Sequence, residues 1–569
     1  MVNFKNVMFY QRKCNTKTLF YDEACLTVSS DKNVSLWKQY TECEGCDYIK
    51  GVFVNNGTED MLVKTIWPLK YQVISGDGGQ ICNGTFGFQE YGRYQLNVTN
   101  NKCSKITVTE QPDEPMLPLL VAIVTMLAIA TLWYAVKGVY KRLVQSEFWN
   151  QILRRGESGD ELLGANPSPT RRASTRLLSA DVFRGITISL MILVNYGGGG
   201  YSQLRHATWN GLTVADMVFP WFAWLMGVSL CLSLHTRLRT AMTRWTAFWQ
   251  VLRRSLILMC LGVIIGSKGR IIEELRLPGV LQRLGLSYLI VAGFECFAMN
   301  ASISYTPGTA IFRDLRSTWR QWAFTFSLVA IHVAVSLGVQ TEGCPRGYLG
   351  PGGLHDGATR GPNSTDTRNC TGGVAGVIDR AVFGPLHLYK GGTFKELYQT
   401  TVPFDPEGLL GTLTCALVVQ LGAQAARVLL AYSHAKARVS RWLFWALLTG
   451  LLAGGLCTFT KNGGPIPINK NLWSLTYCLA TSSIAFFVQA VLYVLIDMQS
   501  IWGGRPFYYA GRNALLLYMG SELMKKKFPF DWSLEYPSHM ELLAMNALAL
   551  ILWLSIAVFL HRKNIILTI

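Results

Sequence analysis

Three polar side chains stand at the junction between two long apolar runs. The stretch from Arg205 to Phe222 carries His206, Asn210 and Asp216 where the chain would enter a bilayer. Ionisable groups at or inside a membrane are costly, so one that is kept there is a functional-site hypothesis by default. A histidine can also exchange protons near neutral pH, because its unperturbed pKa is about 6.5. His206 is therefore the first candidate for proton-transfer chemistry.

The apolar run just before this stretch carries a second set of candidates. Asp181 and Arg184 stand three residues apart at its start, so they share one face of the expected helix. An exposed ion pair worth little free energy is the plain alternative for these two residues. Asn195 lies at the other end of the run and is followed by Gly197–Gly200. Four glycines can let the backbone approach a ligand, or they can simply form a flexible helix end.

Further polar groups stand at the ends of other apolar runs. They are Arg283, Asp405, Glu407, Asn469, Lys470, Asn471, Arg512 and Asn513. So many polar groups on both sides, with glycines and prolines beside them, indicate a polar cavity through a helix bundle. A transporter would have such a cavity as well as an enzyme. His332 lies in the middle of a run and is the rival histidine, although a lone histidine on an apolar face is more often a hydrogen-bonded core residue.

The composition is that of a polytopic membrane protein with an extramembrane extension. Of the 569 residues, 50% are hydrophobic and 15% are charged, whereas soluble domains average about 25% charged residues. A helix needs roughly 20 apolar residues to cross the hydrocarbon core. We expect about eleven spans, near residues 116–137, 182–198, 213–234, 251–268, 279–299, 320–340, 408–430, 440–458, 472–497, 508–524 and 542–560.

The charge pattern gives the expected orientation. A net charge of +18 would suit nucleic acid, but the basic residues fall mainly in alternate loops, which the positive-inside rule makes cytosolic. Lys525–Lys527 is the one poor fit. Glycosylation sequons lie on the opposite side, at Asn33, Asn56, Asn83, Asn97, Asn363 and Asn369. The N-terminus is therefore expected in a lumen or outside, the C-terminus in the cytosol, and the partner is membrane lipid, not nucleic acid.

The chain divides into four expected parts. These are a β-rich luminal domain over 1–113, a first transmembrane helix over 114–143, a basic cytosolic linker over 144–178, and a ten-helix domain over 179–569 with a luminal loop over 341–404. The first part has six cysteines, Cys14, Cys25, Cys43, Cys46, Cys82 and Cys103. Beside sequons, an even count favours disulfides. A redox-active Cys43-x-x-Cys46 or half a zinc site is the alternative, and we expect no metal.

Taken together, the motifs of residues 176–569 resemble the heparan-α-glucosaminide N-acetyltransferase family of lysosomal membrane enzymes. The resemblance rests on residues 179–185 (SADVFRG), 194–199 (VNYGGG), 206–222, 278–285 (PGVLQRLG), 343–353, 369–373 (NCTGG), 405–408 (DPEG) and 467–474 (PINKNLWS). The residues that match the family's essential histidine and asparagine are His206 and Asn195. The Arg184 and Arg283 motifs match as well.

The resemblance implies transfer of acetyl from cytosolic acetyl-CoA to the terminal non-reducing α-glucosamine of heparan sulfate in the lysosome, and it suggests a homodimer. His206 can act as general base on the amine, or can carry the acetyl group itself. Direct transfer is favoured because an acetyl-imidazole in an acidic lumen is prone to hydrolysis, and partial burial would keep the ring neutral. Asn195 is expected to be an oxyanion donor or to orient the histidine.

The remaining candidates are divided between the two substrates. The phosphates of CoA are expected at Arg184, backed by Arg176 and Arg512, with Asp181 orienting Arg184. Arg283 also belongs to this group, although it lies nearer the lumen and can line the cavity instead. The aminosugar is expected at Asp405 and Glu407, with Asn210 and Asp216. Two other functions remain open from the residues, a sugar or anion transporter and an inactive relative that serves as a receptor.

Overall fold

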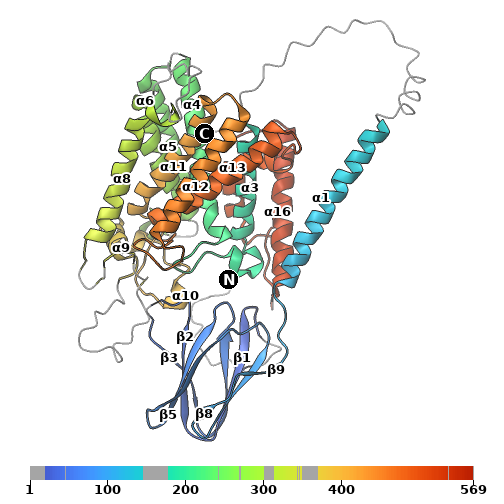
Figure 1. The fold of residues 1–569 in the computed structure, drawn as a ribbon, viewed down its shortest axis with the longest axis vertical. Helices are drawn as coiled ribbons and strands as arrows, with labels where there is room; N and C mark the ends of the chain where they lie inside the picture. The colour runs from blue at the N-terminus through green and yellow to red at the C-terminus, as the bar shows by residue number, and fades with distance from the viewer. Residues whose placement is uncertain are drawn as a thin grey trace.

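The structure is a computed structural model with a β domain at one end and a helical bundle at the other (Figure 1). It describes residues 14, 19–44, 46–144, 177–240, 242–267, 271–299, 313–341, 344, 346–348, 351, 370–535 and 537–567. This architecture confirms the expected fold class of a polytopic helical membrane protein with a small β-rich N-terminal domain. Arg176, Asn363 and Asn369 lie outside the described residues.

The β domain is a sandwich of two sheets. One sheet has the order β4-β1-β7-β8 with β9 also paired to β7, and the other has the order β3-β2-β5-β6. The strands are β1 (Glu23–Ser30), β2 (Val34–Tyr40), β3 (Ile49–Val54), β4 (Gly57–Lys64), β5 (Leu69–Ser75), β6 (Gln80–Phe86), β7 (Arg93–Thr99), β8 (Lys102–Cys103) and β9 (Thr107–Glu110). Alternate apolar residues of both sheets, among them Leu26, Leu36, Leu69 and Leu96, are fully buried between them, as strand periodicity requires.

Disulfides join the cysteines of the β domain, and a further one joins Cys344 to Cys370. Within the described residues the pairs are Cys14–Cys25, Cys43–Cys46, Cys82–Cys103 and Cys344–Cys370. The two cysteines of the C-x-x-C sequence therefore bond to each other. Their side chains are buried in one apolar cluster with Trp209 of the bundle, so this disulfide belongs to the contact between the two parts of the chain.

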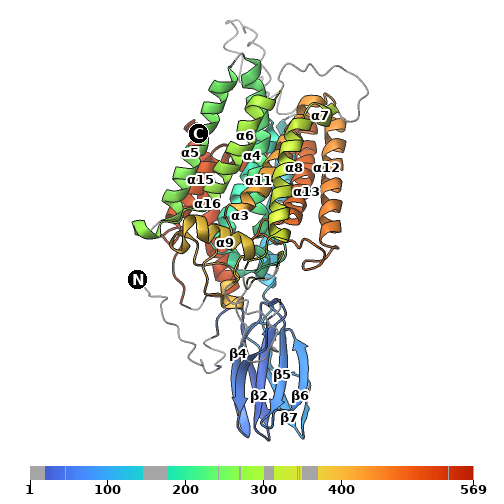
Figure 2. The same ribbon diagram turned by 90° about the vertical axis from the view of Figure 1, so that its left-hand side faces the viewer.

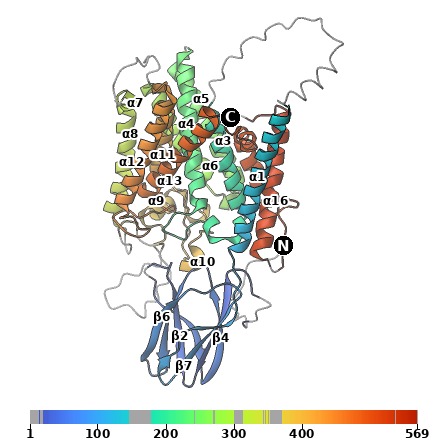
Figure 3. The ribbon, with the colours of Figure 1, turned by 45° about the vertical axis from the view of Figure 1, so that its right-hand side comes forward.

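The described residues form ten helices that are long and apolar enough to cross a membrane. They are α1 (Leu117–Val144), α3 (Leu178–Asn195), α4 (Val214–Arg239), α5 (Arg244–Gly266), α6 (Val280–Ala298), α8 (Trp319–Gly338), α11 (Leu410–Ala431), α12 (Ala435–Leu456), α13 (Leu475–Leu492) and α16 (His539–Arg562). The short helices are α7 (Arg313–Arg316), α9 (Gly373–Phe383), α10 (Lys395–Tyr398), α14 (Phe507–Arg512) and α15 (Ala514–Met524). Helix α1 lies outside the bundle, near α16 at the end that faces the β domain and diverging from it toward the other end (Figure 1 and Figure 3).

The expected span over 508–524 is not one continuous helix. It is divided at Asn513 into α14 and α15, and the 11 residues of α15 are too few to cross a bilayer alone. The side chain of Asn513 donates to the carbonyl of Ile565 at 3.0 Å and accepts from the amide of Leu567 at 3.1 Å. The break is thus stabilised by the end of the chain, which sequence periodicity does not reveal.

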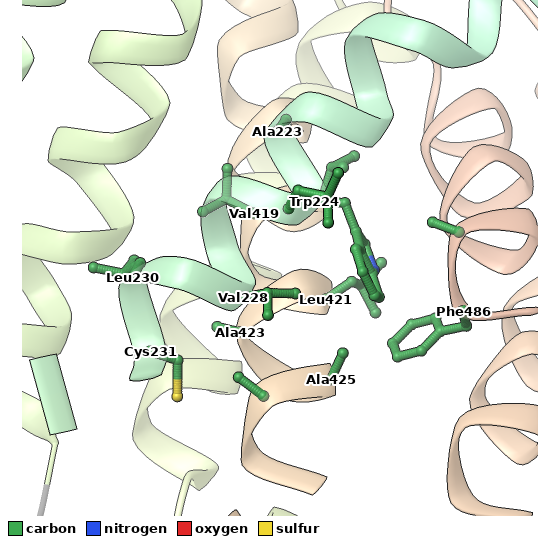
Figure 4. Packing of buried hydrophobic residues seen from close by; sticks show 14 of the residues in the cluster. Ala223, Trp224, Val228, Leu230, Cys231, Val419, Leu421, Ala423, Ala425 and Phe486 are labelled. Carbon is green, nitrogen blue, oxygen red and sulfur yellow. The ribbon is translucent and has the colours of Figure 1, made fainter. Parts of the chain in front are cut away.

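Two glycines bring α4 and α11 into close contact at the centre of the bundle (Figure 4). A Cβ atom on Gly227 would lie 1.9 Å from the carbonyl oxygen of Val419, and one on Gly422 would lie 1.8 Å from that of Trp224. The ring of Trp224 then packs edge-on against Phe486 of α13 at 5.2 Å between centroids. Glycine at both positions is required for this approach, as small residues commonly are between membrane helices.

We predict that Gly422→Ala destabilises the bundle, because the added methyl group overlaps backbone of α4. Overpacking of this kind costs about 1–3 kcal/mol or more. Gly455→Ala on α12 is the matched control, since a Cβ atom there meets nothing within 4 Å. Thermal unfolding of both variants in detergent checks the difference. Equal melting temperatures for the two variants would contradict the packing described here.

Candidate active site

The loop before α4 is held at the end of the bundle that faces the β domain. Figure 2 shows α9 at this same end of the bundle. Thr213 caps the N-terminus of α4, and Asp216, three residues later, accepts a hydrogen bond from the backbone amide of Thr213 at 3.1 Å. This capping box fixes the first turn of α4. It also places the Asp216 carboxylate beneath the loop that carries His206.

Asp216 orients the imidazole of His206. Nδ1 of His206 lies 2.8 Å from Oδ1 of Asp216, and Oδ2 accepts from the amide of Ala207 at 3.1 Å. Because the buried carboxylate acts as an acceptor, Nδ1 carries the proton in the neutral ring. Nε2 is then the basic nitrogen, and among the described residues it has no hydrogen-bond partner.

Lys470 adds a positive charge next to the carboxylate of Asp216. Its Nζ lies 3.6 Å from Oδ1 of Asp216. Burial lowers the pKa of His206 below its usual value, and the charge of Lys470 lowers it further, while Asp216 opposes both effects. The imidazole is 31% exposed and lies at the wall of a cavity, so burial and exposure both bear on its pKa. A lowered pKa keeps the ring neutral at more acidic pH.

His206 opens into a cavity of about 400 Å³ that is walled by α3, α4, α5, α6 and α15. Its polar lining includes Asn195, Arg276, Glu407, Lys470 and Glu522. The side chain of Asn195 donates a hydrogen bond of 2.6 Å to Oε1 of Glu522. The cavity thus joins one neutral base, an amide, and carboxyl groups of two different segments, and such convergent polar groups are typical of a ligand site.

Arg276 holds two carboxylates at one edge of this cavity. It makes two hydrogen bonds of 2.7 Å to Asp405 and a third of 2.7 Å to Glu407. Burial raises the pKa of Asp405, but Arg276 outweighs it and the net pKa is below the usual value. Burial also raises the pKa of Glu407, the charge of Arg276 opposes it, and that of Asp405 adds to it, leaving a raised pKa. Glu407 is therefore the carboxyl group that more readily holds a proton.

The structure brings some of the expected site residues together in one cavity. Others bind to neighbouring side chains. Asn195, His206 and Glu407 line one cavity. Asp216, expected to bind substrate, supports His206 instead, and so takes the orienting role considered for Asn195. Asp405, also expected to bind substrate, is tied to Arg276.

Asn210 was also expected to bind substrate, and the structure shows its contacts within the chain. Its amide group donates to Glu44 of the β domain at 3.1 Å, and its oxygen accepts from Asn469 at 2.9 Å. The side chain therefore links the loop before α4 to the β domain and to the segment that precedes α13. His332 is fully buried, with Nδ1 3.5 Å from the hydroxyl of Tyr348, as expected for a core histidine.

The described arginines expected to bind CoA are not among the residues that line the cavity. Arg184 contacts Asp181 at 3.0 Å and Ser229 at 2.6 Å, and eleven residues of helix, about 16 Å, separate it from Asn195. Arg512 lies on α14, which packs against the same part of α3. Arg283 is buried, where it donates to the carbonyl of Gly408 at 2.7 Å.

Sequence reasoning missed three residues of the cavity. Arg276 and Glu522 were not singled out, and Lys470 was noted as a polar residue beside a span without a role. Each is a charged residue next to the end of an apolar run, which is the signal that could have found it. Their partners could not be found this way, because Arg276 and Asp405 are 129 residues apart in sequence.

We predict that Lys470→Met raises the pKa of His206, because it removes a positive charge that lowers it. The pH at which the ring becomes half neutral should then move upward. The rate of diethyl pyrocarbonate modification of His206, followed by mass spectrometry across pH, measures this midpoint because only the neutral ring reacts. Lys461→Met, which removes an exposed lysine paired with Glu42, should leave the midpoint in place. A downward or absent shift in Lys470→Met would contradict the assignment.

Comparison with known proteins finds relatives that are similar over most of the chain. No protein-family model matches the sequence. The chain is 37% identical over 529 residues to heparan-alpha-glucosaminide N-acetyltransferase of Homo sapiens, an alignment that covers 85% of this chain and 77% of the human protein. It is also 37% identical over 514 residues to the Mus musculus enzyme of the same name, with 85% and 77% covered.

These alignments are long enough to include the bundle and the cavity together. Identity at this level over most of both chains indicates shared ancestry with these enzymes. Because of this similarity over most of its length, the chain belongs to the heparan-α-glucosaminide N-acetyltransferase family of enzymes.

Proposed function

We propose that this chain transfers an acetyl group from cytosolic acetyl-CoA to the terminal non-reducing α-glucosamine of heparan sulfate in the lysosomal lumen, as a step in heparan sulfate degradation. The observation that carries the proposal is the His206–Asp216 hydrogen bond of 2.8 Å at the wall of the cavity. It directs the proton to Nδ1 and leaves Nε2 as a base. Acyl transfer to an aminosugar needs such a base, because the amine is protonated and unreactive at acidic pH.

In the proposed step, Nε2 of His206 takes a proton from the ammonium group of glucosamine. The amine nitrogen then forms a bond to the thioester carbonyl carbon, and the carbon–sulfur bond breaks. The CoA thiolate leaves and takes up the second amine proton. The route through an acetyl-imidazole on Nε2 is the alternative, and it differs by forming a covalent intermediate. Direct transfer is preferred because it exposes no acetyl-imidazole to water.

The lining of the cavity suits both reacting groups. Glu522 offers a carboxyl group that can attract a cationic aminosugar, and Glu407 offers one that can hydrogen-bond to the sugar. Asn195 is close enough to Glu522 to be held in place by it, and its amide group can donate to the oxyanion of the tetrahedral intermediate. A donor of this kind typically contributes about 10²–10³-fold in rate.

The donor is proposed to arrive from the opposite side of the bundle. Arg184, oriented by Asp181, would bind the phosphates of CoA, with Arg512 nearby and Arg176 on the linker. The cavity reaches Met191 on α3, seven residues or about 10 Å from Arg184. An extended pantetheine arm along α3 would then bring the thioester to His206. In this orientation the β domain is luminal and the end of α16 is cytosolic.

We predict that His206→Ala lowers acetyl transfer by at least about 10²-fold, the usual contribution of general base catalysis. Asp216→Asn should also lose about 10²–10⁴-fold, because the carboxamide no longer favours the Nδ1–H tautomer. His434→Ala, at an exposed position before α12, is the matched control. The assay measures N-acetylglucosamine formed by proteoliposomes from labelled acetyl-CoA and glucosamine.

Product formation in His206→Ala at the wild-type rate would refute the catalytic assignment. Passage of labelled glucosamine across the membrane without acetylation would favour the transporter instead.

We also predict that CoA raises the melting temperature of the wild-type protein, since a ligand at 100 times its Kd stabilises by about 2.7 kcal/mol. Arg184→Ala should lose most of this shift because it removes the cation proposed for the phosphates. Arg253→Ala, an exposed arginine of α5, should retain it. No shift in the wild-type protein would count against CoA as donor, and an equal shift in both variants would exclude Arg184 from the phosphate site.

A further inference from the structure

We infer that the β domain contributes to the active site. An ion pair between Asp22 of the β domain and Arg205 of the loop before α4 positions His206. The inference rests on the proposed function for its rate measurements. Arg205 is next to His206 in sequence, whereas Asp22 belongs to the β domain, just before β1. A positioning residue of this kind would act through the loop and would not touch the substrate.

The ion pair is well formed and partly shielded from water, with the arginine side chain 35% exposed. Nη1 of Arg205 lies 2.9 Å from Oδ2 of Asp22, and the aspartate side chain is 11% exposed. The guanidinium group also lies over the ring of Tyr21, at 5.4 Å from its centroid. Partly desolvated ion pairs with several contacts are more rigid than ion pairs on the surface, which contribute little to stability. Arg205 therefore has a defined position.

A buried cluster supports Asp22 from behind. Nε2 of His539, at the start of α16, lies 2.8 Å from Glu90 and 3.8 Å from Asp22, while its Nδ1 lies 2.7 Å from the carbonyl of Gly199. The ligand atoms of Asp22, Glu90 and His539 are within 4.8 Å of one another, a spacing that could hold a metal ion. Arg205 already brings a positive charge to these carboxylates. We therefore interpret the group as a set of contacts that joins the β domain to the loop before α4 and to α16.

The β domain holds the other end of the loop as well. Glu44 accepts a hydrogen bond of 3.1 Å from Asn210. Trp209 is fully buried in the cluster that contains the Cys43–Cys46 disulfide. Residues 205–210 are thus anchored to the β domain at both ends, and His206 lies between the anchors. Asp216 fixes the direction of the ring, and the anchors fix the backbone from which the ring projects.

This arrangement has a kinetic consequence. Loss of the Asp22–Arg205 contact should let the loop shift while Asp216 still holds Nδ1, so Nε2 moves relative to the acceptor amine. A displacement of about 1 Å in a reacting group can cost about 10²-fold in rate. The kcat should therefore fall, whereas the KM for acetyl-CoA should change little, because the proposed phosphate site lies at the far end of α3.

The test compares Arg205→Gln, Asp22→Asn, their combination and Arg205→Lys in the full chain. Lys461→Gln is the control, because it breaks another ion pair between the two parts of the chain, Lys461–Glu42, which involves no residue of 205–210. We expect each single variant to lower kcat by about 10–100-fold, the double variant to be no worse than the poorer single one, and Arg205→Lys to recover part of the rate. Lys461→Gln should match the wild type.

Wild-type kcat in both single variants, or losses that multiply in the double variant, would overturn the inference. A loss that follows only the amount of folded protein, seen by gel filtration, would also overturn it. If the wild-type protein does not acetylate glucosamine, the proposed function fails separately. The rate at which diethyl pyrocarbonate modifies His206 at a fixed pH then decides the inference, since Arg205→Gln should change this rate and Lys461→Gln should not.

Discussion

The hydrogen bond between His206 and Asp216 is the constraint around which the site is organised. The same carboxylate caps the first turn of α4 and accepts from Nδ1 of the imidazole. Helix geometry and ring orientation are therefore coupled, because a change at the start of α4 would alter both. The close packing of α4 on α11 through Gly227 and Gly422 holds this helix in place. Carboxylate-supported histidines serve as bases on unrelated folds for the same physical reason.

The charges around the cavity affect the pKa of His206. Lys470 lies beside Asp216, and burial and Lys470 together lower the pKa of His206. Across the cavity, Arg276 keeps Asp405 ionised and leaves Glu407 with a raised pKa. The site thus combines a neutral base with carboxyl groups of different acidity. Such a division of roles between neighbouring titratable groups is typical of acid–base sites.

Much of the fold could be predicted because membrane helices and strands leave local signals. Each expected apolar run overlaps a helix, and strands β1 to β9 all lie within residues 1–113, the part expected to be β-rich. The break at Asn513 could not be predicted, since it depends on hydrogen bonds to the chain end 52 and 54 residues away. His206 and Asn195 were found from residue type and resemblance. The roles of Asp216 and Arg276 were not, because they depend on contacts that only the folded chain creates.

The central claim is that Nε2 of His206 faces the reacting centre from the wall of the cavity. A cryo-EM structure of the protein with CoA and glucosamine bound tests it most directly. The account predicts the CoA sulfur and the sugar amine inside the cavity, with the amine within about 3–3.5 Å of Nε2, the separation of a near-attack arrangement. A sulfur atom bound elsewhere, or His206 turned into a dry helix contact away from both ligands, would contradict it.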